Sequence, residues 1–309
     1  MKIITITLCP AFDIHCYTPN FAPYHENLVK ITDYDACGKG VNISRALMVN
    51  GVKSLAIVAI GEENGDNFKK KLVKDGLTFS AIPVGGRIRE NITLHTNNAD
   101  ETRISFEGFS ADKSLLDKTA AILSDEDLSS AYVTFTGRVP SGIDMADVKD
   151  FLRDLKGKGA KVVIDSRSFE LSDLVDVCPW LIKPNQEEIS VYLGKEINSF
   201  EDALSGAREF QAKGINNVMI SLGPQGALLV SESGAYSAVP PKVDARSTIG
   251  AGDSSIGGFL AAAIEGENVA GMLRRAVSYG TAACMTEGTR PPRKCDVETV
   301  YEQVKVTEI

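Results

Sequence analysis

The chain is predicted to be an α/β protein with a mostly parallel central sheet, helices on both faces of that sheet and a small additional β-sheet. Short apolar runs alternate with helical patterns from Ser114 onward, which is typical of parallel strands buried on both faces. Two stretches, at about 11–37 and 87–108, lack this alternation and are rich in turn and strand residues. No internal repeat or linker divides the chain, so residues 1–309 are expected to form a single domain.

In the first part of the chain, alternating Ile and Thr predict a strand at 3–8, and a continuous apolar run predicts a buried strand at 54–60. Helical spacing predicts helices at 41–50 and 67–75. Asn50-Gly51 and Gly76 follow these two segments and favour the ends of the helices.

The two irregular stretches are expected to form the small sheet. Residues 11–37 contain loops and extended pieces, and residues 89–96 and 102–106 flank the turn-rich tetrapeptide Asn97-Asn98-Ala99-Asp100. We therefore expect a sheet built from two insertions that covers a site as a lid.

The second part of the chain follows a regular strand and helix alternation. Strands are expected at 131–136, 161–165, 180–183, 217–221 and 226–230, and helices at about 115–123, 146–156, 186–193, 200–212, 251–265, 269–286 and 296–304. Ligands of parallel sheets bind outside the carboxyl ends of the strands. Gly137, Asp165, Lys183 and Gly223 lie at or just beyond such ends.

Composition excludes several classes of protein. The net charge of −8 argues against a general nucleic-acid binder, and no apolar stretch approaches the roughly 18 residues that span a bilayer. We expect no secretory signal and no membrane partner. The six cysteines are scattered without a C-x-x-C pair, which favours free thiols in the reducing cytoplasm.

One glycine-rich stretch carries the strongest chemical signal. Gly250 and Gly252 flank Ala251, Asp253 follows directly, and small apolar residues continue in a helical pattern. Glycines let consecutive N–H groups converge, and a helix that begins there adds its positive dipole end, which together favour an anion. A carboxylate beside an anion suits a base that takes a proton during transfer. The alternative is that Asp253 merely caps the helix.

Two other phosphate-loop interpretations fail because a required residue is replaced. Gly137 and Gly142 have the spacing of a Walker A loop, but Ile143-Asp144 stands where Lys-Ser/Thr is needed. The Gly250 stretch has Ser255 where a dinucleotide fingerprint needs its third glycine.

A second glycine-rich stretch, Gly38-Lys39-Gly40-Val41-Asn42, precedes a predicted helix. It is either a plain turn or a place where Lys39 and Asn42 meet a hydroxylated ligand.

Together, the two glycine-rich stretches resemble the two signatures of the ribokinase-like (PfkB) sugar kinases. Further segments match this family in order along nearly the whole chain, at residues 7–13, 137–142, 165–166, 183–188 and 221–226. The resemblance implies a ribokinase-like fold with a β-sheet lid.

The resemblance also implies roles for residues of the phosphoryl-transfer site. Asp253 is then the base for the sugar hydroxyl, while the N–H groups around Gly250, Ala251 and Gly252 stabilise the transferring phosphoryl group. Residues expected to bind ATP are Lys183, Asn185, Ser221, Gly223, Gly226 and Thr248. Asn185 and Glu188 match the family's magnesium-associated motif and are expected to hold Mg²⁺ through water. Glu188 could otherwise belong to a solvated helix face.

The acceptor is suggested by arginines. Arg89 and Arg103, on predicted lid strands, resemble positions that the phosphohexose branch of the family uses for a second phosphate, although each alone could be a surface charge. Residues implied to meet the sugar hydroxyls are Asp13, Gly38, Lys39 and Asn42.

Three residues depart from the branch's pattern. Cys9 stands where Asn is common, Ile88 replaces a Thr, and Arg138 replaces a Ser near the acceptor phosphate. Arg138 either strengthens phosphate binding or reshapes the pocket for another acceptor.

The expected activity is ATP- and Mg²⁺-dependent phosphorylation of a hexose monophosphate, foremost fructose 1-phosphate to fructose 1,6-bisphosphate. The alternatives are tagatose 6-phosphate, fructose 6-phosphate, and then a non-phosphorylated sugar or nucleoside. A sugar-phosphate sensor is the alternative without catalysis. The resemblance also implies a possible homodimer formed through the lid.

Overall fold

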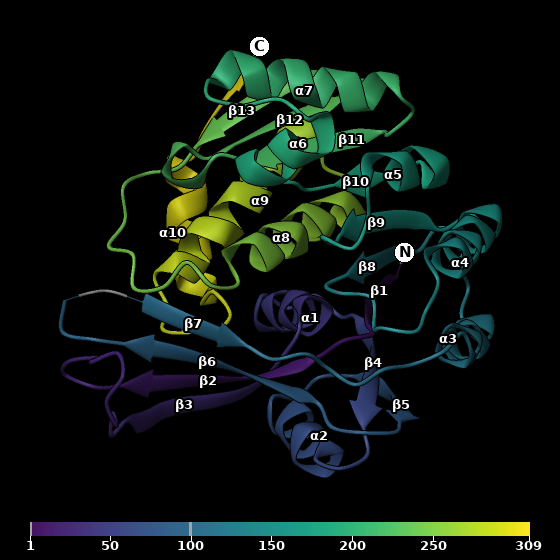
Figure 1. Ribbon diagram of the computed structural model, residues 1–309. Coiled ribbons are helices and arrows are strands. Elements are labelled where there is room, and N and C mark those ends of the chain that lie inside the picture. The colour runs from purple at the N-terminus through teal and green to yellow at the C-terminus, as the bar shows by residue number, and fades with distance from the viewer. Residues whose placement is uncertain (1, 99–100) are drawn as a thin grey trace.

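The computed structural model describes residues 2–98 and 101–309, and its centre is a ten-stranded sheet (Figure 1). Its strands are β1 (Ile3–Thr7), β4 (Leu55–Gly61), β5 (Phe79–Val84), β8 (Tyr132–Thr136), β9 (Lys161–Asp165), β10 (Leu181–Ile182), β11 (Asn217–Ser221), β12 (Ala227–Ser231), β13 (Gly234–Val239) and β14 (Lys305–Glu308). The order is β14-β13-β12-β11-β10-β9-β8-β1-β4-β5. All pairs from β11 to β5 are parallel, and β12, β13 and β14 pair antiparallel. The predicted mostly parallel sheet is confirmed.

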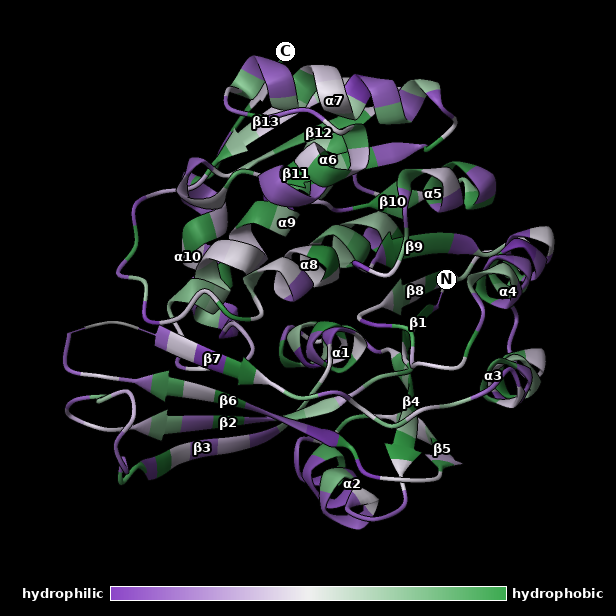
Figure 2. Ribbon diagram, viewed as in Figure 1, coloured by the Kyte–Doolittle hydropathy of each residue, from purple (hydrophilic) through white to green (hydrophobic). Residues whose placement is uncertain are grey.

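Helices cover both faces of this sheet, as predicted. They are α1 (Lys39–Val49), α2 (Gly65–Lys74), α3 (Ser114–Ser124), α4 (Met145–Gly157), α5 (Leu171–Val177), α6 (Gln186–Leu193), α7 (Phe200–Ala212), α8 (Ala251–Glu265), α9 (Val269–Cys284) and α10 (Lys294–Gln303). One buried apolar cluster joins the sheet to α1, α8, α9 and α10, and a second joins it to α2 through α7. Figure 2 shows hydrophobic residues along central strands such as β4 and β8.

Helix α8 is the most deeply buried helix around the site, and its small residues explain why. Gly258 is so close to α9 that an added Cβ would lie 2.5 Å from the carbonyl oxygen of Arg275. Gly257 faces α1, where a Cβ would contact Ala46 at 3.4 Å. The apolar run after Asp253 therefore places the start of α8 between two neighbouring helices.

The small sheet contains four strands, β2 (Ala11–Tyr17), β3 (Lys30–Cys37), β6 (Arg89–His95) and β7 (Glu101–Ser105), in the order β3-β2-β6-β7. Strands β2 and β6 pair in parallel, and the outer pairs are antiparallel. Figure 1 shows this sheet at one side of the molecule, beside α1 and β4. Ala99 and Asp100 of the predicted hairpin turn lie outside the described residues.

Several elements differ from the sequence prediction. Strands β5, β13 and β14 and helix α5 were not predicted. Strand β5 contains Pro83 and forms one edge of the sheet, and the short, largely exposed β14 forms the other. Helix α5 has only seven residues, too few for a helical period to be visible. Strand β10 is shorter than expected, because Pro184 follows closely.

Within the described residues, every helix is too short or too polar to cross a lipid bilayer. The six cysteines are free thiols, as predicted.

Candidate active site

The candidate site begins at the N-terminus of α8, beside the carboxyl ends of the parallel strands. Gly250 is the N-cap and has a φ of 79°, a left-handed conformation that favours glycine. The N–H of Ala251 points to the carbonyl of Thr248 at 3.4 Å and closes a turn there. The N–H groups of the first helical turn have no partner inside the helix. The sequence-predicted residues 248 and 250–253 thus form one turn whose first N–H groups can accept an anion, and we call it the anion-binding turn.

Asp253 lies in this first turn and is held by an amide from α1. Asn42 Nδ2 donates to Asp253 Oδ2 at 2.8 Å, and the carboxylate is 8% exposed. Burial raises the pKa of Asp253 from 3.8 to about 6, with Lys39 and the Asn42 hydrogen bond acting in the opposite direction. A carboxylate with such a pKa can accept a proton near neutral pH.

Two lysines converge beside this carboxylate on Asp165, at the end of β9. Lys39 Nζ lies 3.0 Å from Asp165 Oδ1 and Lys183 Nζ lies 3.8 Å from Asp165 Oδ2. Burial by itself would raise the pKa of Asp165, but Lys183 and Lys39 outweigh it and lower the pKa. A Cβ built on Gly252 would lie 3.0 Å from Lys183 Nζ, so this ammonium lies directly against the anion-binding turn.

Asp165 was not assigned a role from the sequence. Its signals were its position at the end of a buried strand and the family match at residues 165–166, and its two lysine partners come from distant parts of the chain.

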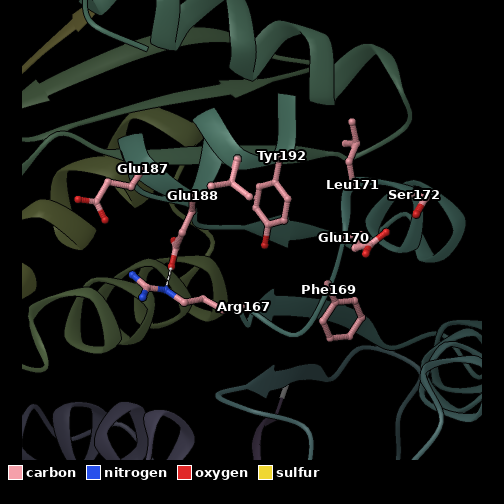
Figure 3. A pocket seen from close by; sticks show the side chains of 9 residues that line it. Arg167, Phe169, Glu170, Leu171, Ser172, Glu187, Glu188 and Tyr192 are labelled. Atoms are coloured by element: carbon pink, nitrogen blue, oxygen red, sulfur yellow. Dashed lines mark hydrogen bonds and ion pairs between the residues drawn. The ribbon is translucent and has the colours of Figure 1, made fainter. Parts of the chain in front are cut away.

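The predicted metal motif forms a reciprocal cap at the start of α6. Asn185 Oδ1 accepts the Glu188 N–H at 2.8 Å, and Glu188 Oε2 accepts the Asn185 N–H at 3.0 Å. Arg167 Nε donates to Glu188 Oε1 at 2.8 Å (Figure 3).

The donor set at this cap is compatible with Mg²⁺. Within residues 2–98 and 101–309, no group of three or more His, Cys, Asp or Glu side chains gathers as a metal cage. Magnesium in kinases is typically held by one or two carboxylates, waters and the substrate phosphates. Glu188 could supply one carboxylate to such an ion.

The predicted nucleotide segments meet beside this motif. Ser221 ends β11 and forms an isolated bridge with Asn185. Gly223 begins a short 3₁₀ turn. Gly226 has a φ of 93°, and a Cβ there would lie 1.9 Å from the carbonyl oxygen of Ala238. The predicted residues therefore form one tight loop next to Asn185.

The predicted acceptor residues lie at the other side of the site. Gly38 caps α1 and packs so closely on Thr7 that a Cβ would lie 2.6 Å from its Cγ2. Asp13 on β2 is in register with Asn91 on β6, and Asn91 Nδ2 donates to Asp13 Oδ1 at 2.9 Å.

Asn91 was not among the predicted site residues, although it follows Arg89 by two positions. The buried Oδ1 atoms of Asn91 and Asn42 have no hydrogen-bond partner among the described residues. Both amides thus donate to a carboxylate and keep an acceptor free for a hydroxyl group.

The predicted arginines are only partly brought together. Arg89 and Arg138 both act on Cys9: burial raises the pKa of this thiol, and the two guanidinium groups oppose the effect. A Cβ on Gly108 would contact Cys9 Sγ at 2.9 Å and Arg89 Cδ at 3.7 Å. Arg103 is exposed on the edge strand β7, in register with Thr93. The alternation of strand residues places it on the face that carries Asn91.

Comparison with known proteins identifies the family of the chain. The pattern of the pfkB family carbohydrate kinases matches residues 2–295. The chain is 31% identical over 286 residues to 1-phosphofructokinase of Escherichia coli K12, covering 91% of this chain and 90% of that protein. It is 27% identical over 304 residues to ATP-dependent 6-phosphofructokinase isozyme 2 of the same strain, covering 97% and 98%.

Solved structures give the same result. Phosphofructokinase-2 from Escherichia coli in complex with substrates and products matches with a TM-score of 0.92 at 26% identity, covering 98% of this chain and 99% of that one. The predicted ribokinase-like fold is confirmed, and the chain belongs to the PfkB family of carbohydrate kinases.

Proposed function

We propose that this sugar-phosphate kinase transfers the γ-phosphoryl group of ATP to fructose 1-phosphate, giving fructose 1,6-bisphosphate. The main observation that supports this reaction is the environment of Asp253. It is a buried carboxylate with a pKa of about 6, at the helix start where Lys183 lies against Gly252.

In this proposal Asp253 removes the proton of the acceptor hydroxyl as that oxygen attacks the γ-phosphorus, and the bond from this phosphorus to the β,γ-bridging oxygen breaks, with ADP as the leaving group. The first-turn N–H groups of α8, together with Lys183, stabilise the charge on the transferring group. Asp165 pairs with Lys39 and Lys183 and keeps both ammonium groups beside the reacting atoms.

Magnesium would lie near Asn185 and Glu188, held through water and the ATP phosphates, and would neutralise phosphate charge. The loop of Ser221, Gly223 and Gly226, with Thr248, would surround the nucleotide.

A phosphorylated acceptor is supported by the arginines. A phosphate needs fixed cations, and the charges of Arg89 and Arg138 both act on Cys9. Arg103 would approach the same ligand from β7. Asp13, Asn42 and the N-cap region of Gly38 would bind the sugar hydroxyls. Fructose 1-phosphate is preferred because 1-phosphofructokinase of Escherichia coli is 31% identical. The alternatives are tagatose 6-phosphate and fructose 6-phosphate, and a 6-phosphofructokinase isozyme is 27% identical.

The test is an acceptor screen with ATP and Mg²⁺. We expect the highest kcat/KM for fructose 1-phosphate, lower values for fructose 6-phosphate and tagatose 6-phosphate, and the lowest for free fructose, ribose and nucleosides. A higher kcat/KM for another hexose monophosphate would show that this sugar phosphate, and not fructose 1-phosphate, is the preferred acceptor. A higher kcat/KM for a free sugar would contradict the proposal that the arginines bind an acceptor phosphate. Binding of sugar phosphate without turnover of any acceptor would indicate a sensor.

We also propose a homodimer formed through the small sheet, and a cytoplasmic location consistent with six free thiols. Ile14, Ile92 and Ile104 lie in register across three strands, on the face opposite Asp13. Ile104 is 47% exposed and Ile31, on β3, is 60% exposed. A second copy would cover this apolar face.

A further inference from the structure

Arg167 lies just beyond β9 and makes an ion pair that the proposed mechanism does not use. Its Nε donates to Glu188 Oε1 at 2.8 Å, and its side chain is 70% exposed whereas that of Glu188 is 15% exposed. Figure 3 shows the guanidinium directed at the carboxylate from a segment separate from α6. The pair therefore joins the end of β9 to the predicted metal motif.

Both oxygens of Glu188 are engaged in the structure. Oε2 accepts the backbone N–H of Asn185 at 3.0 Å, which is part of the cap of α6, and Oε1 accepts from Arg167. The backbone donor belongs to the helix start and is fixed. A metal ion, or a water bound to it, would therefore meet Glu188 at Oε1, the oxygen that Arg167 contacts.

The surroundings favour a divalent cation over a guanidinium once such an ion is present. Arg167 borders a cavity of about 680 Å³ that is also lined by Glu170, Glu187, Glu188 and Tyr192. Arg167 is the one basic side chain among the residues that line it. The cavity lining carries three carboxylates and one monovalent cation, of which only Glu188 pairs with Arg167, and this excess of negative charge attracts Mg²⁺ or Mn²⁺.

We propose that Arg167 is a positioning residue that competes with the divalent metal for Glu188. Without metal it neutralises Glu188, and it gives way when the metal binds, whether or not the nucleotide is present. The exposed position of Arg167 makes this exchange feasible, because water screens its side of the pair and surface ion pairs typically contribute about 0.2–1 kcal/mol. The inference rests on the proposed role of Glu188 in metal binding.

The experiment is Mn²⁺ titration of the nucleotide-free, full-length protein by calorimetry or by the electron paramagnetic resonance signal of free Mn²⁺. Arg167→Gln removes the charge and is expected to tighten Mn²⁺ binding by up to about fivefold, which corresponds to about 1 kcal/mol. Arg167→Lys should lie between this variant and the unmutated protein. Glu188→Gln should weaken binding.

The matched control is Arg153→Gln. Arg153 is also exposed and pairs with a carboxylate, Asp176, at 2.6 Å, but it lies on α4. Its replacement should leave Mn²⁺ affinity unchanged. As a second readout, the free Mg²⁺ concentration that gives half-maximal turnover should fall in Arg167→Gln and not in Arg153→Gln.

The outcomes separate this inference from the proposed function. If Glu188→Gln weakens Mn²⁺ binding while Arg167→Gln leaves it unchanged or weakens it, only the competition is overturned. If Glu188→Gln has no effect while Mg²⁺-dependent turnover persists, the metal does not use Glu188. The metal assignment and the inference then both fail, and the kinase proposal stands. Absence of Mn²⁺ binding in both the unmutated protein and Arg167→Gln also overturns the competition.

Discussion

Asp253 combines an unfavourable burial with a chemical role. Its carboxylate is 8% exposed, and burial moves its pKa from 3.8 to about 6. An acid with this pKa is mostly ionised at pH 7 yet basic enough to accept a proton. The same shift means that the charged form is disfavoured in the folded protein. Replacing Asp253 by a neutral residue should therefore lower the catalytic rate and raise the stability of the fold.

The pH dependence follows directly from this shift. The base is active only when it is ionised, so kcat/KM for the acceptor should be level above pH 6 and fall about tenfold per unit below it. His15, on β2, has a pKa lowered from 6.5 by burial and by His95, so its protonation is a rival explanation of such an acid limb. A His15→Asn variant should keep the acid limb. Loss of the limb in that variant would contradict the assignment to Asp253.

Replacement of the base itself should separate chemistry from binding. Asp253→Asn should reduce kcat by a factor of about 10² to 10⁴ and leave ATP affinity, measured by calorimetry, within a few-fold. Turnover close to that of the unmutated protein would remove Asp253 from its proposed role.

The same variant should be more stable than the unmutated protein at high pH. A raised folded-state pKa means that stability is lost as pH rises through about 6. Since one pKa unit corresponds to 1.36 kcal/mol, Asp253→Asn should raise the free energy of unfolding at pH 8 by up to about 3 kcal/mol. The gain should vanish below pH 4. Urea unfolding at both pH values measures it, and an equal gain at both would exclude ionisation as the cause.

Arg89 provides a test of the phosphate-bearing acceptor. Arg89→Ala should raise KM for fructose 1-phosphate tenfold or more, since a charge-assisted hydrogen bond contributes about 1.5–3 kcal/mol, and should leave KM for ATP nearly unchanged. The matched control is Arg87→Ala, because Arg87 is an exposed neighbour that pairs with Glu90. Equal effects of the two substitutions would identify Arg89 as a general surface charge.

At the scale of the element, the start of α8 depends on close approach. A methyl group at Gly252 would lie 3.0 Å from Lys183 Nζ, so Gly252→Ala should displace the ammonium from the anion-binding turn. We expect kcat to fall by about tenfold or more, consistent with loss of an oxyanion-type donor, with a small change in melting temperature.

A helix elsewhere supplies the control for this substitution. A Cβ at Gly157, the last residue of α4, would meet no heavy atom within 4 Å. Gly157→Ala should therefore leave kcat unchanged. A similar loss of kcat in both variants would rule out displacement of Lys183.

At the scale of the whole molecule, the small sheet joins the site on one face to an apolar surface on the other. Ile104→Glu places a charge in that surface and should convert a dimer into monomers, as measured by light scattering after gel filtration. Val239→Glu is the control, because Val239 is 49% exposed on β13 of the large sheet. A monomeric unmutated protein would contradict the proposed dimer.

Local patterns were sufficient for much of the fold. Strands β1, β4, β8, β9 and β11 are continuous apolar or alternating runs, and burial of a whole run is visible in the sequence itself. The edge strands β5 and β14 were not predicted. Both are only partly buried, so their sequences show no clear alternation of apolar and polar residues. Residues 11–37 were expected to contain loops and extended pieces of a small sheet, but the bounds of β2 and β3 were not predicted, because β2 pairs on one side with β6 of the distant second insertion.

The sequence by itself determined the family resemblance, the anion-binding turn of Gly250 to Gly252 and the carboxylate of Asp253 within it, because those groups are neighbours along the chain. Only the tertiary structure decided which groups meet from distant segments. Asn42 contacts Asp253, two lysines converge on Asp165, and Arg167 reaches Glu188. The physical reason is that pKa values and ion pairs depend on burial and on distances across the fold, which sequence separation does not encode.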